Sequence, residues 1–384
     1  MSGTRRGLVG RREIGVFEPY LGHDTLDAVA RAFHDRWLGM GSATREFEHR
    51  IAEFLGLEGR EVVATNTGTS ALHLALLSAG ARPGVEVIVA SFNFVADHQA
   101  ITATGATSVF CDIESETLGL DPERVSELVN DCTGVLLPLH FSGIPSRIAE
   151  LHEVASEHGL RVVEDATHAF GTAVDGRSVG SFGDLACFSF DPVKVITSVD
   201  GGAIVLPNAE DAVVARERRM LGIDRDAVDR HKRQRPWDYD VTLPGFRYHL
   251  SNVLARVGLS QLERIDEFIA NRQTYCQRYQ RHLAGVDGIR TPRSGYEDVS
   301  PFIYWIRVEG GRRAALIAHL RERGIETGIH FMPAHSYSLY RDCRRGELPV
   351  TERVCSEVLT LPLHSFMRED DIDYVCESIA DLLT

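Results

Sequence analysis

The residues of this sequence best suited to chemistry follow three apolar segments. The first segment is followed by Gly68, Thr69 and Ser70, directly before the apolar helical pattern of residues 71–80. Gly68 allows a tight turn and a close backbone approach. The two hydroxyls and the free backbone N–H groups of a helix start favour phosphate, helped by the helix dipole. The pattern predicts a phosphate site, although an ordinary helix cap has the same residues.

The second segment, residues 161–165, ends in two carboxylates, of which Asp165 is the last. A carboxylate in such a place loses hydration unless it meets a cation or hydrogen-bond donors. A pyridinium nitrogen is such a cation, and the pairing keeps a pyridine ring protonated as an electron sink. The alternative is a capping or ion-paired aspartate.

The third segment, residues 185–190, is followed by Lys194 and then by the pair Gly201 and Gly202. Lysine forms Schiff bases, and burial or a cationic neighbour lowers its pKa for that work. The glycine pair suggests crowded backbone nearby, which argues against an ordinary surface lysine. A phosphate site, a ring-nitrogen partner and an imine-forming lysine together predict a pyridoxal 5'-phosphate (PLP) site with Lys194 and Asp165 as catalytic residues.

The elements that position these residues are apolar strands alternating with helices. Strands are expected near residues 61–66, 86–92, 106–113, 134–141, 161–168, 185–190 and 201–207. Continuous apolar strands between helices predict an α/β fold with a mostly parallel central sheet covered on both faces. Ligands bind at the carboxyl ends of such strands, which is where all three segments place their polar residues.

The length of 384 residues favours two domains. We expect an N-terminal arm and a large cofactor-binding domain in residues 1–250. Residues 251–384 would form a bridging helix, at about 250–285, and a smaller α+β domain. That domain is expected to contain strands near 304–309 and 325–331 and helices near 315–324 and 370–383. The charged stretch 222–245 reads as a long loop.

Composition excludes several classes of protein. The net charge of −14 argues against a nucleic-acid binder, which would normally show a basic face. Seven scattered cysteines without a CxxC pair make a disulfide framework or a zinc site unexpected, so no metal is predicted. No signal-peptide core and no run of about 20 apolar residues is present, so we expect a soluble, cytoplasmic protein without membrane contact.

The ordered motifs resemble the DegT/StrS family of fold-type I, PLP-dependent sugar aminotransferases. The similarity covers nearly the whole chain, in residues 19–56, 65–80, 87–113, 162–194, 324–336 and 359–373. The resemblance implies the PLP-transferase fold type I and a homodimer whose active sites are built from both chains. It also implies a ping-pong reaction through Schiff bases, with glutamate or glutamine as the amino donor and a nucleotide-linked keto sugar as the acceptor.

Carried over by position, the resemblance assigns roles to several residues. Lys194 would hold the cofactor and move the substrate proton, and Asp165 would pair with the pyridine nitrogen. Phe94 matches the position that stacks on the cofactor ring, and His168 the position beside its phenolic oxygen. Plain core packing is the alternative for both aromatic side chains. Phosphate contacts fall on Gly68, Thr69, Ser70 and Ser189.

The sequence departs from the family pattern at three places. Val195 follows the lysine where asparagine is common, Asp200 stands in TSVDGG where TTGEGG is common, and residues 245–249 read GFRYH in place of GYNYR. The asparagine of that last motif typically reaches the neighbouring chain's cofactor phosphate. Arg247 could do so with a full charge and a forked geometry, or it could form an interface salt bridge.

Substrate contacts are expected from His330 and His335 on the smaller domain and from Arg225 in the long loop, with Lys232, Arg233 and Arg235 as further cations. A solvated basic loop and surface histidines are the alternatives. Two other functions stay open. One is a different PLP reaction, or transamination of a cyclitol or another non-sugar ketone. The other is a non-catalytic sensor on a PLP fold.

Overall fold

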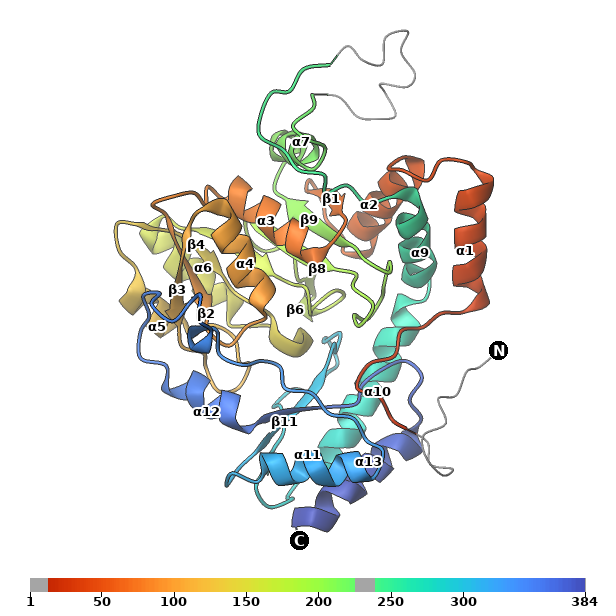
Figure 1. The fold of residues 1–384 in the computed structure, drawn as a ribbon, viewed down its shortest axis with the longest axis vertical. Coiled ribbons are helices and arrows are strands. Elements are labelled where there is room, and N and C mark those ends of the chain that lie inside the picture. The colour runs from red at the N-terminus through yellow and green to blue at the C-terminus, as the bar shows by residue number, and fades with distance from the viewer. Residues whose placement is uncertain (1–12, 225–238, 384) are drawn as a thin grey trace.

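The computed structural model describes residues 13–224 and 239–383 (Figure 1). The larger part contains a seven-stranded sheet in the order β1-β9-β8-β5-β4-β2-β3. Its strands are Glu61–Thr65 (β1), Glu86–Ala90 (β2), Thr107–Cys111 (β3), Thr133–Leu137 (β4), Arg161–Asp165 (β5), Leu185–Ser189 (β8) and Gly202–Leu206 (β9). β9 pairs antiparallel with both of its neighbours, and every other pairing is parallel.

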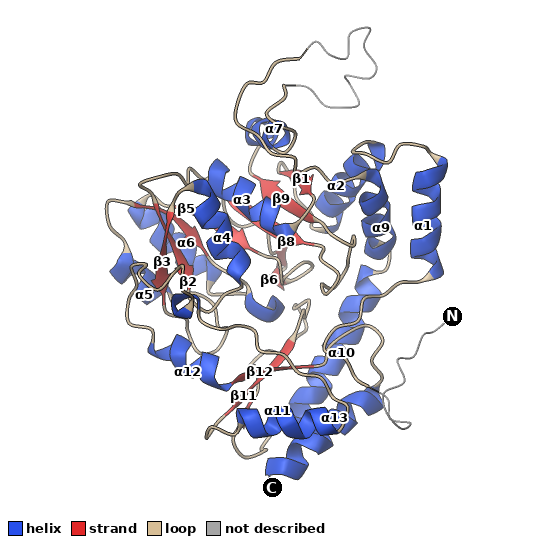
Figure 2. Ribbon diagram, in the orientation of Figure 1, coloured by secondary structure: helices blue, strands red, loops and turns tan. Residues whose placement is uncertain are grey.

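Helices cover both faces of this sheet (Figure 2). Alternate strand residues point to opposite faces, so Val63 and Val62 enter different cores. One face is covered by Gly68–Ser78 (α3), Val95–Thr104 (α4) and Ala209–Arg218 (α7). The other face is covered by Ser42–Phe54 (α2), Pro122–Leu128 (α5), Ile148–His158 (α6) and Asn252–Leu262 (α9). His23–His34 (α1) packs on α9.

The long helix Ile265–Leu283 (α10) leads to the smaller part of the structure (Figure 1). There an antiparallel sheet has the order β10-β11-β12. Its strands are Ile289–Arg290 (β10), Tyr304–Val308 (β11) and Val358–Leu361 (β12). The helices here are Arg313–Glu322 (α11), Pro349–Glu357 (α12) and Glu369–Leu383 (α13). Single 3-10 turns lie at Phe141–Gly143, between β4 and α6, and at Ala334–Ser336, before α12. One apolar core joins α10, α11 and α13 to the small sheet.

The α/β fold with a mostly parallel sheet is confirmed, and all seven strands expected from the sequence lie in that sheet. The short hairpin Ala173–Val174 (β6) and Arg177–Ser178 (β7) was not expected. The domain boundary at residue 250 stays a prediction. Among the described residues, no helix is long and apolar enough to cross a membrane.

Two expectations about the second half are wrong. The helical pattern of residues 250–285 is two helices, because the chain turns at Glu263 and Arg264 between α9 and α10. Residues 325–331 form no strand. Ile325 makes an isolated bridge with Ile14, and Gly328 makes one with Thr360 of β12. Beyond that bridge the chain leaves the small sheet and carries His330 into a cavity beside the large one.

Candidate active site

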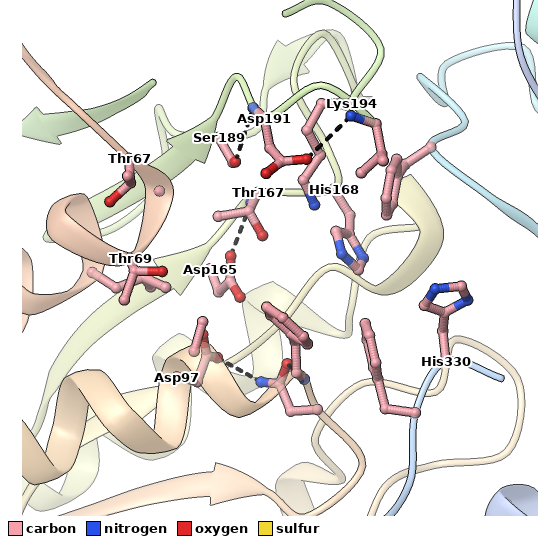
Figure 3. A pocket seen from close by; sticks show the side chains of 18 of the residues that line it. Thr67, Thr69, Asp97, Asp165, Thr167, His168, Ser189, Asp191, Lys194 and His330 are labelled. Carbon is pink, nitrogen blue, oxygen red and sulfur yellow. Dashed lines mark hydrogen bonds between the residues drawn. The ribbon is translucent and has the colours of Figure 1, made fainter. Parts of the chain in front are cut away.

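A cavity of about 420 Å³ lies where the carboxyl ends of β1, β2, β5 and β8 meet the start of the reversed strand β9. That volume is in the range of roughly 300–1,000 Å³ found for small-molecule sites. Figure 3 shows polar side chains from several elements turned into it. Among the residues predicted from the sequence, the lining includes Gly68, Thr69, Phe94, Asp165, His168, Ser189, Lys194 and His330.

One end of the cavity is formed by the start of α3. Thr67 caps this helix by accepting a hydrogen bond from the backbone N–H of Ser70 at 3.0 Å. The Ser70 hydroxyl donates to Asn66 Oδ1 at 2.7 Å, and Ser70 is not among the lining residues. Gly68 and Thr69, the next residues of the first turn, do line the cavity. Their positions suit an anion, because N–H groups in a helix's first turn have no partner within the helix.

Glycines make this end narrow. A Cβ on Gly68 would lie 2.8 Å from the Ser189 Cβ, and one on Gly202 would lie 2.4 Å from the carbonyl oxygen of Thr67. The turn before α3 therefore sits directly against β8 and β9. Ser189 also lines the cavity, so a hydroxyl and the helix start lie at the same end.

The floor of the cavity holds two neighbouring carboxyl groups. Asp165, at the end of β5, is buried and accepts a hydrogen bond from the backbone N–H of Thr167 at 2.9 Å. Asp97, in the first turn of α4, is also buried and contacts Asp165 (Figure 3). Burial and the charge of Asp165 raise the pKa of Asp97 well above its ordinary value. Asp97 and Asp165 together therefore retain part of a proton and carry less than two negative charges.

Lys194 lies in the turn that follows β8, where its backbone N–H donates to the carbonyl of Asp191 at 3.0 Å. Its Nζ is 4.0 Å from the centre of the Phe302 ring. Burial lowers the pKa of Lys194 to about 8, although the charges of Asp165, Asp191 and Asp97 oppose that shift. A lysine with this pKa has a free amine about a tenth of the time at pH 7, far more than an exposed lysine.

His168 is buried beside Lys194, and its ring lies 4.3 Å from that of Phe302. Burial, followed by the charges of Lys194 and His330, lowers the pKa of His168 well below its ordinary value. The ring is therefore neutral at pH 7. Its Nδ1 accepts a hydrogen bond from the backbone N–H of Ser142 at 3.3 Å, which assigns the proton to Nε2. His168 can thus donate one hydrogen bond into the cavity.

The mouth of the cavity is aromatic. Phe94 is about half exposed and packs against Phe331, with ring centres 5.5 Å apart. His330 is held from behind by a hydrogen bond between its Nδ1 and the Thr360 hydroxyl at 2.8 Å. An exposed aromatic ring at the edge of a site is available to stack on a planar ligand.

Two further predicted residues, His335 and Arg247, lie elsewhere. The His335 Nδ1 bonds the Ser91 hydroxyl at 2.8 Å, and His335 does not line the cavity. Arg247 is exposed beside Met220, away from the cavity of its own chain. Arg225, with Lys232, Arg233 and Arg235, falls outside the described residues.

Sequence reasoning missed several lining residues, above all Asp97 and Phe302. Asp97 had a detectable signal, since an acidic residue follows an apolar strand by a few positions and so lies at the ligand-binding edge. Phe302 had none, because it precedes β11 of the distant small sheet.

Comparisons with known proteins identify this arrangement. The model of the DegT/DnrJ/EryC1/StrS aminotransferase family matches residues 19–380. The chain belongs to this family. It is 34% identical over 370 residues to the dTDP-4-dehydro-2,3,6-trideoxy-D-glucose 4-aminotransferase of Saccharopolyspora spinosa, covering 95% of each chain.

Solved structures of this family have the same fold. The aminotransferase TlmJ from Streptoalloteichus hindustanus is 35% identical, with a TM-score of 0.89, and the match covers 96% of this chain and 98% of that one. A 3-amino-5-hydroxybenzoic acid synthase is 28% identical, with a TM-score of 0.86 and coverage of 96% and 98%. The protein is thus a PLP-dependent aminotransferase, as the sequence predicted, and a non-catalytic sensor is set aside.

The residues of the cavity fit this cofactor. The narrow end at α3 offers backbone N–H groups and the Ser189 hydroxyl to a phosphate. Asp165 lies deep on the floor, where its carboxylate accepts a hydrogen bond from the Thr167 N–H and can also meet a cationic partner. Lys194, with its lowered pKa, lies in the same cavity. The phosphate, the ring nitrogen and the aldehyde of PLP therefore each have a suitable partner among these residues.

Proposed function

We propose that this aminotransferase moves an amino group from glutamate or glutamine to the keto carbon of a nucleotide-linked sugar. The observation that carries the proposal is the presence of Lys194 and Asp165 in one cavity that also receives the start of α3. The sugar substrate is supported by the 34% identical relative, whose name specifies a dTDP-linked keto sugar. A cytoplasmic location stays a prediction.

When bound, PLP supplies an electron sink that stabilises negative charge at the carbon bearing the nitrogen. In the proposed assignment, Gly68, Thr69 and Ser189 bind the phosphate. Phe94 would cover one face of the ring, and the Nε2–H of His168 would donate a hydrogen bond to the phenolic oxygen. Ser70 would support the phosphate site indirectly, since its hydroxyl holds Asn66 beside the helix start.

Lys194 performs the covalent and proton-transfer work in this proposal. Its free amine would hold the cofactor covalently, with loss of water, and the lowered pKa supplies that amine near neutral pH. Once an amino donor has taken its place, the Lys194 Nζ would accept the proton from the donor's α-carbon and hold it for return. The Phe302 ring, 4.0 Å away, holds the protonated form by a cation–π contact between these two steps. When the keto acceptor is bound, Lys194 would move the proton in the opposite direction.

In this proposal, Asp165 would keep the cofactor's ring nitrogen protonated. An ionised carboxylate at that atom keeps the nitrogen protonated, which makes the ring a stronger electron sink. The backbone N–H of Thr167 fixes the Asp165 carboxylate from one side. Replacing Asp165 with asparagine keeps the shape and removes the charge, so we expect a large loss of turnover with modest loss of binding.

The second chain of a homodimer would complete the phosphate end. Among the described lining residues, Lys194 is the only lysine or arginine, whereas Asp97, Asp165, Asp191 and Asp200 are acidic. A phosphate beside Asp200 needs a cation, and the described residues of the same chain bring no arginine and no second lysine to this lining. Arg247 is exposed on the segment that runs along the turn before α3, which makes it available to a neighbour.

Mixed dimers test this shared site. Chains with Lys194→Ala and chains with Arg247→Ala are each expected to be nearly inactive alone. Co-expressed, they would form some dimers with one intact site, and activity would recover to about a quarter of wild type under random pairing. Arg247→Lys serves as the charge-conserving control. No recovery on mixing would place the function of Arg247 within its own chain.

A non-sugar acceptor remains the second candidate. The 28% identical structure of 3-amino-5-hydroxybenzoic acid synthase shows that this scaffold serves an enzyme named for an aromatic product. Val195 and Asp200, which depart from the common pattern of the family, lie at or next to the cavity. This candidate predicts turnover of cyclic ketones that carry no nucleotide.

Separate half-reactions test the proposal. Adding glutamate or glutamine should convert the cofactor to its amino form, which shifts its visible absorbance into the near ultraviolet. The amino form is then offered a panel of nucleotide-linked keto sugars and keto-cyclitols, with products read by mass spectrometry. Lys194→Ala is the control without turnover. A cofactor spectrum that no amino donor changes would contradict the proposed reaction, and amination of cyclitols alone would favour the second candidate.

A further inference from the structure

Asp97 is a second carboxyl group behind the cofactor site. It is the third residue of α4, and its side chain is 1% exposed. The Asn93 amide donates to its Oδ2 at 2.5 Å, and the carboxyl group is hydrogen-bonded to Asp165. Figure 3 shows the two carboxyl groups next to one another below the position of Lys194.

Two carboxyl groups in contact share a proton, because two adjacent buried negative charges repel strongly. The groups that act on Asp97 are Asp165, Lys194, the Asn93 amide and the positive end of α4. Asn93 and Lys194 favour the charged form of Asp97, but burial and Asp165 outweigh them, so its pKa is raised. The nearby Cys187 thiol is neutral, because burial and the same two carboxyls raise its pKa.

The proton of this pair belongs on Asp97. Three carboxylates stabilise protonated Lys194 by their charge. Of these, Asp165 has the largest effect and Asp97 the smallest. Asp165 also accepts a backbone N–H from Thr167. The ammonium charge of Lys194 and the Thr167 N–H therefore act on the Asp165 side of the pair, which leaves the proton to Asp97. A neutral Asp97 then has one O–H to donate, and the Asp165 carboxylate is its acceptor.

We propose that Asp97 is a protonated positioning residue that donates its O–H to Asp165 and holds that carboxylate toward the cofactor's ring nitrogen. This inference rests on the proposed pairing of Asp165 with the ring nitrogen. A carboxylate that already accepts an O–H hydrogen bond is a weaker base. The proton between the ring nitrogen and Asp165 therefore stays on the nitrogen and does not move to the carboxylate.

Two variants of Asp97 distinguish the effect of its hydrogen-bond donor from the effect of removing the side chain. Asp97→Asn keeps an N–H donor for Asp165 and an oxygen acceptor for Asn93, so it imitates the protonated acid. Asp97→Ala removes both contacts. We expect Asp97→Ala to weaken PLP binding about tenfold, which corresponds to the loss of a charge-assisted hydrogen bond. Asp97→Asn should restore most of that loss, as read by cofactor titration of the full-length protein.

Infrared difference spectroscopy tests the protonation itself. The wild-type protein at pH 7 should show the C=O stretch of a protonated carboxyl group, shifted in D₂O, that Asp97→Asn lacks. A merely structural aspartate would not give this band. The inference is overturned if wild type and Asp97→Asn have the same protonated-carboxyl spectrum, or if Asp97→Asn binds PLP as weakly as Asp97→Ala. Asp165→Asn tests the ring pairing separately, since unchanged turnover in that variant would refute the pairing while leaving the wild-type band in place.

Discussion

Replacing Gly202 with alanine tests whether the turn before α3 is the phosphate site. The added methyl carbon would lie 2.4 Å from the Thr67 carbonyl oxygen and 2.8 Å from the Gly68 nitrogen. Both are backbone atoms, so no side-chain rotation relieves the contact. Gly202 is paired with Thr65 on one side and Ser189 on the other, which holds β9 in place. We therefore expect the turn to move.

Overpacking of this kind costs about 1–3 kcal/mol. If the turn moves, the PLP-binding geometry is lost, and affinity should fall about 5- to 150-fold, since 1.4 kcal/mol is tenfold. The assay is a PLP titration of the cofactor-depleted protein, together with its unfolding midpoint. Gly39→Ala is the control, because a Cβ there meets nothing within 4 Å. Unchanged PLP affinity with a lowered unfolding midpoint would contradict the prediction, because the clash would then cost stability without reaching cofactor binding.

Further predictions concern charge and hydrogen bonding. Burial lowers the pKa of Lys194 to about 8. The rate at which cofactor-free protein reacts with pyridoxal should therefore rise with pH and reach half its maximum near pH 8. A rate that still rises at pH 10 would contradict the burial of this amine. His168→Ala leaves the buried Ser142 N–H without its acceptor and should destabilise folding by about 1–3 kcal/mol, whereas His168→Asn restores that acceptor without the Nε2 donor and should lower turnover with less effect on unfolding. The pKa of Asp97 is raised in the folded protein, so its contribution to stability is complete below the ordinary aspartate range and is lost as pH rises. As pH rises above the ordinary aspartate range, the unfolding midpoint of Asp97→Asn should therefore increase relative to that of wild type. A difference that does not change with pH would contradict the raised pKa.

Most of the large sheet could be predicted because its strands are continuous apolar runs that end in polar residues. The strand that ends in Asp165 and the strand before Lys194 are examples, and their positions in the sheet follow from the parallel α/β pattern. The apolar pattern of residues 250–285 could not reveal the turn at Glu263 and Arg264, because both residues suit a helix interior as well as a boundary.

Residues whose role depends on distant contacts could not be predicted. Phe302 reaches Lys194 from a segment more than a hundred positions away, held by the hydrogen bond between its backbone N–H and the carbonyl of Ser142. His335 and His330 look alike in sequence, yet one bonds Ser91 and the other lines the cavity. The apolar alternation of residues 325–331 favoured a strand, but tertiary contacts direct this segment to the cavity mouth.

The covalent bond between Lys194 and the cofactor can be tested directly by borohydride reduction of the PLP-loaded protein, followed by digestion and mass spectrometry. We predict that the mass of the reduced cofactor appears on the peptide containing Lys194, and that Lys194→Ala shows no labelled peptide. Labelling of a different lysine in a wild-type sample that transaminates would contradict the assignment on which the proposed reaction depends.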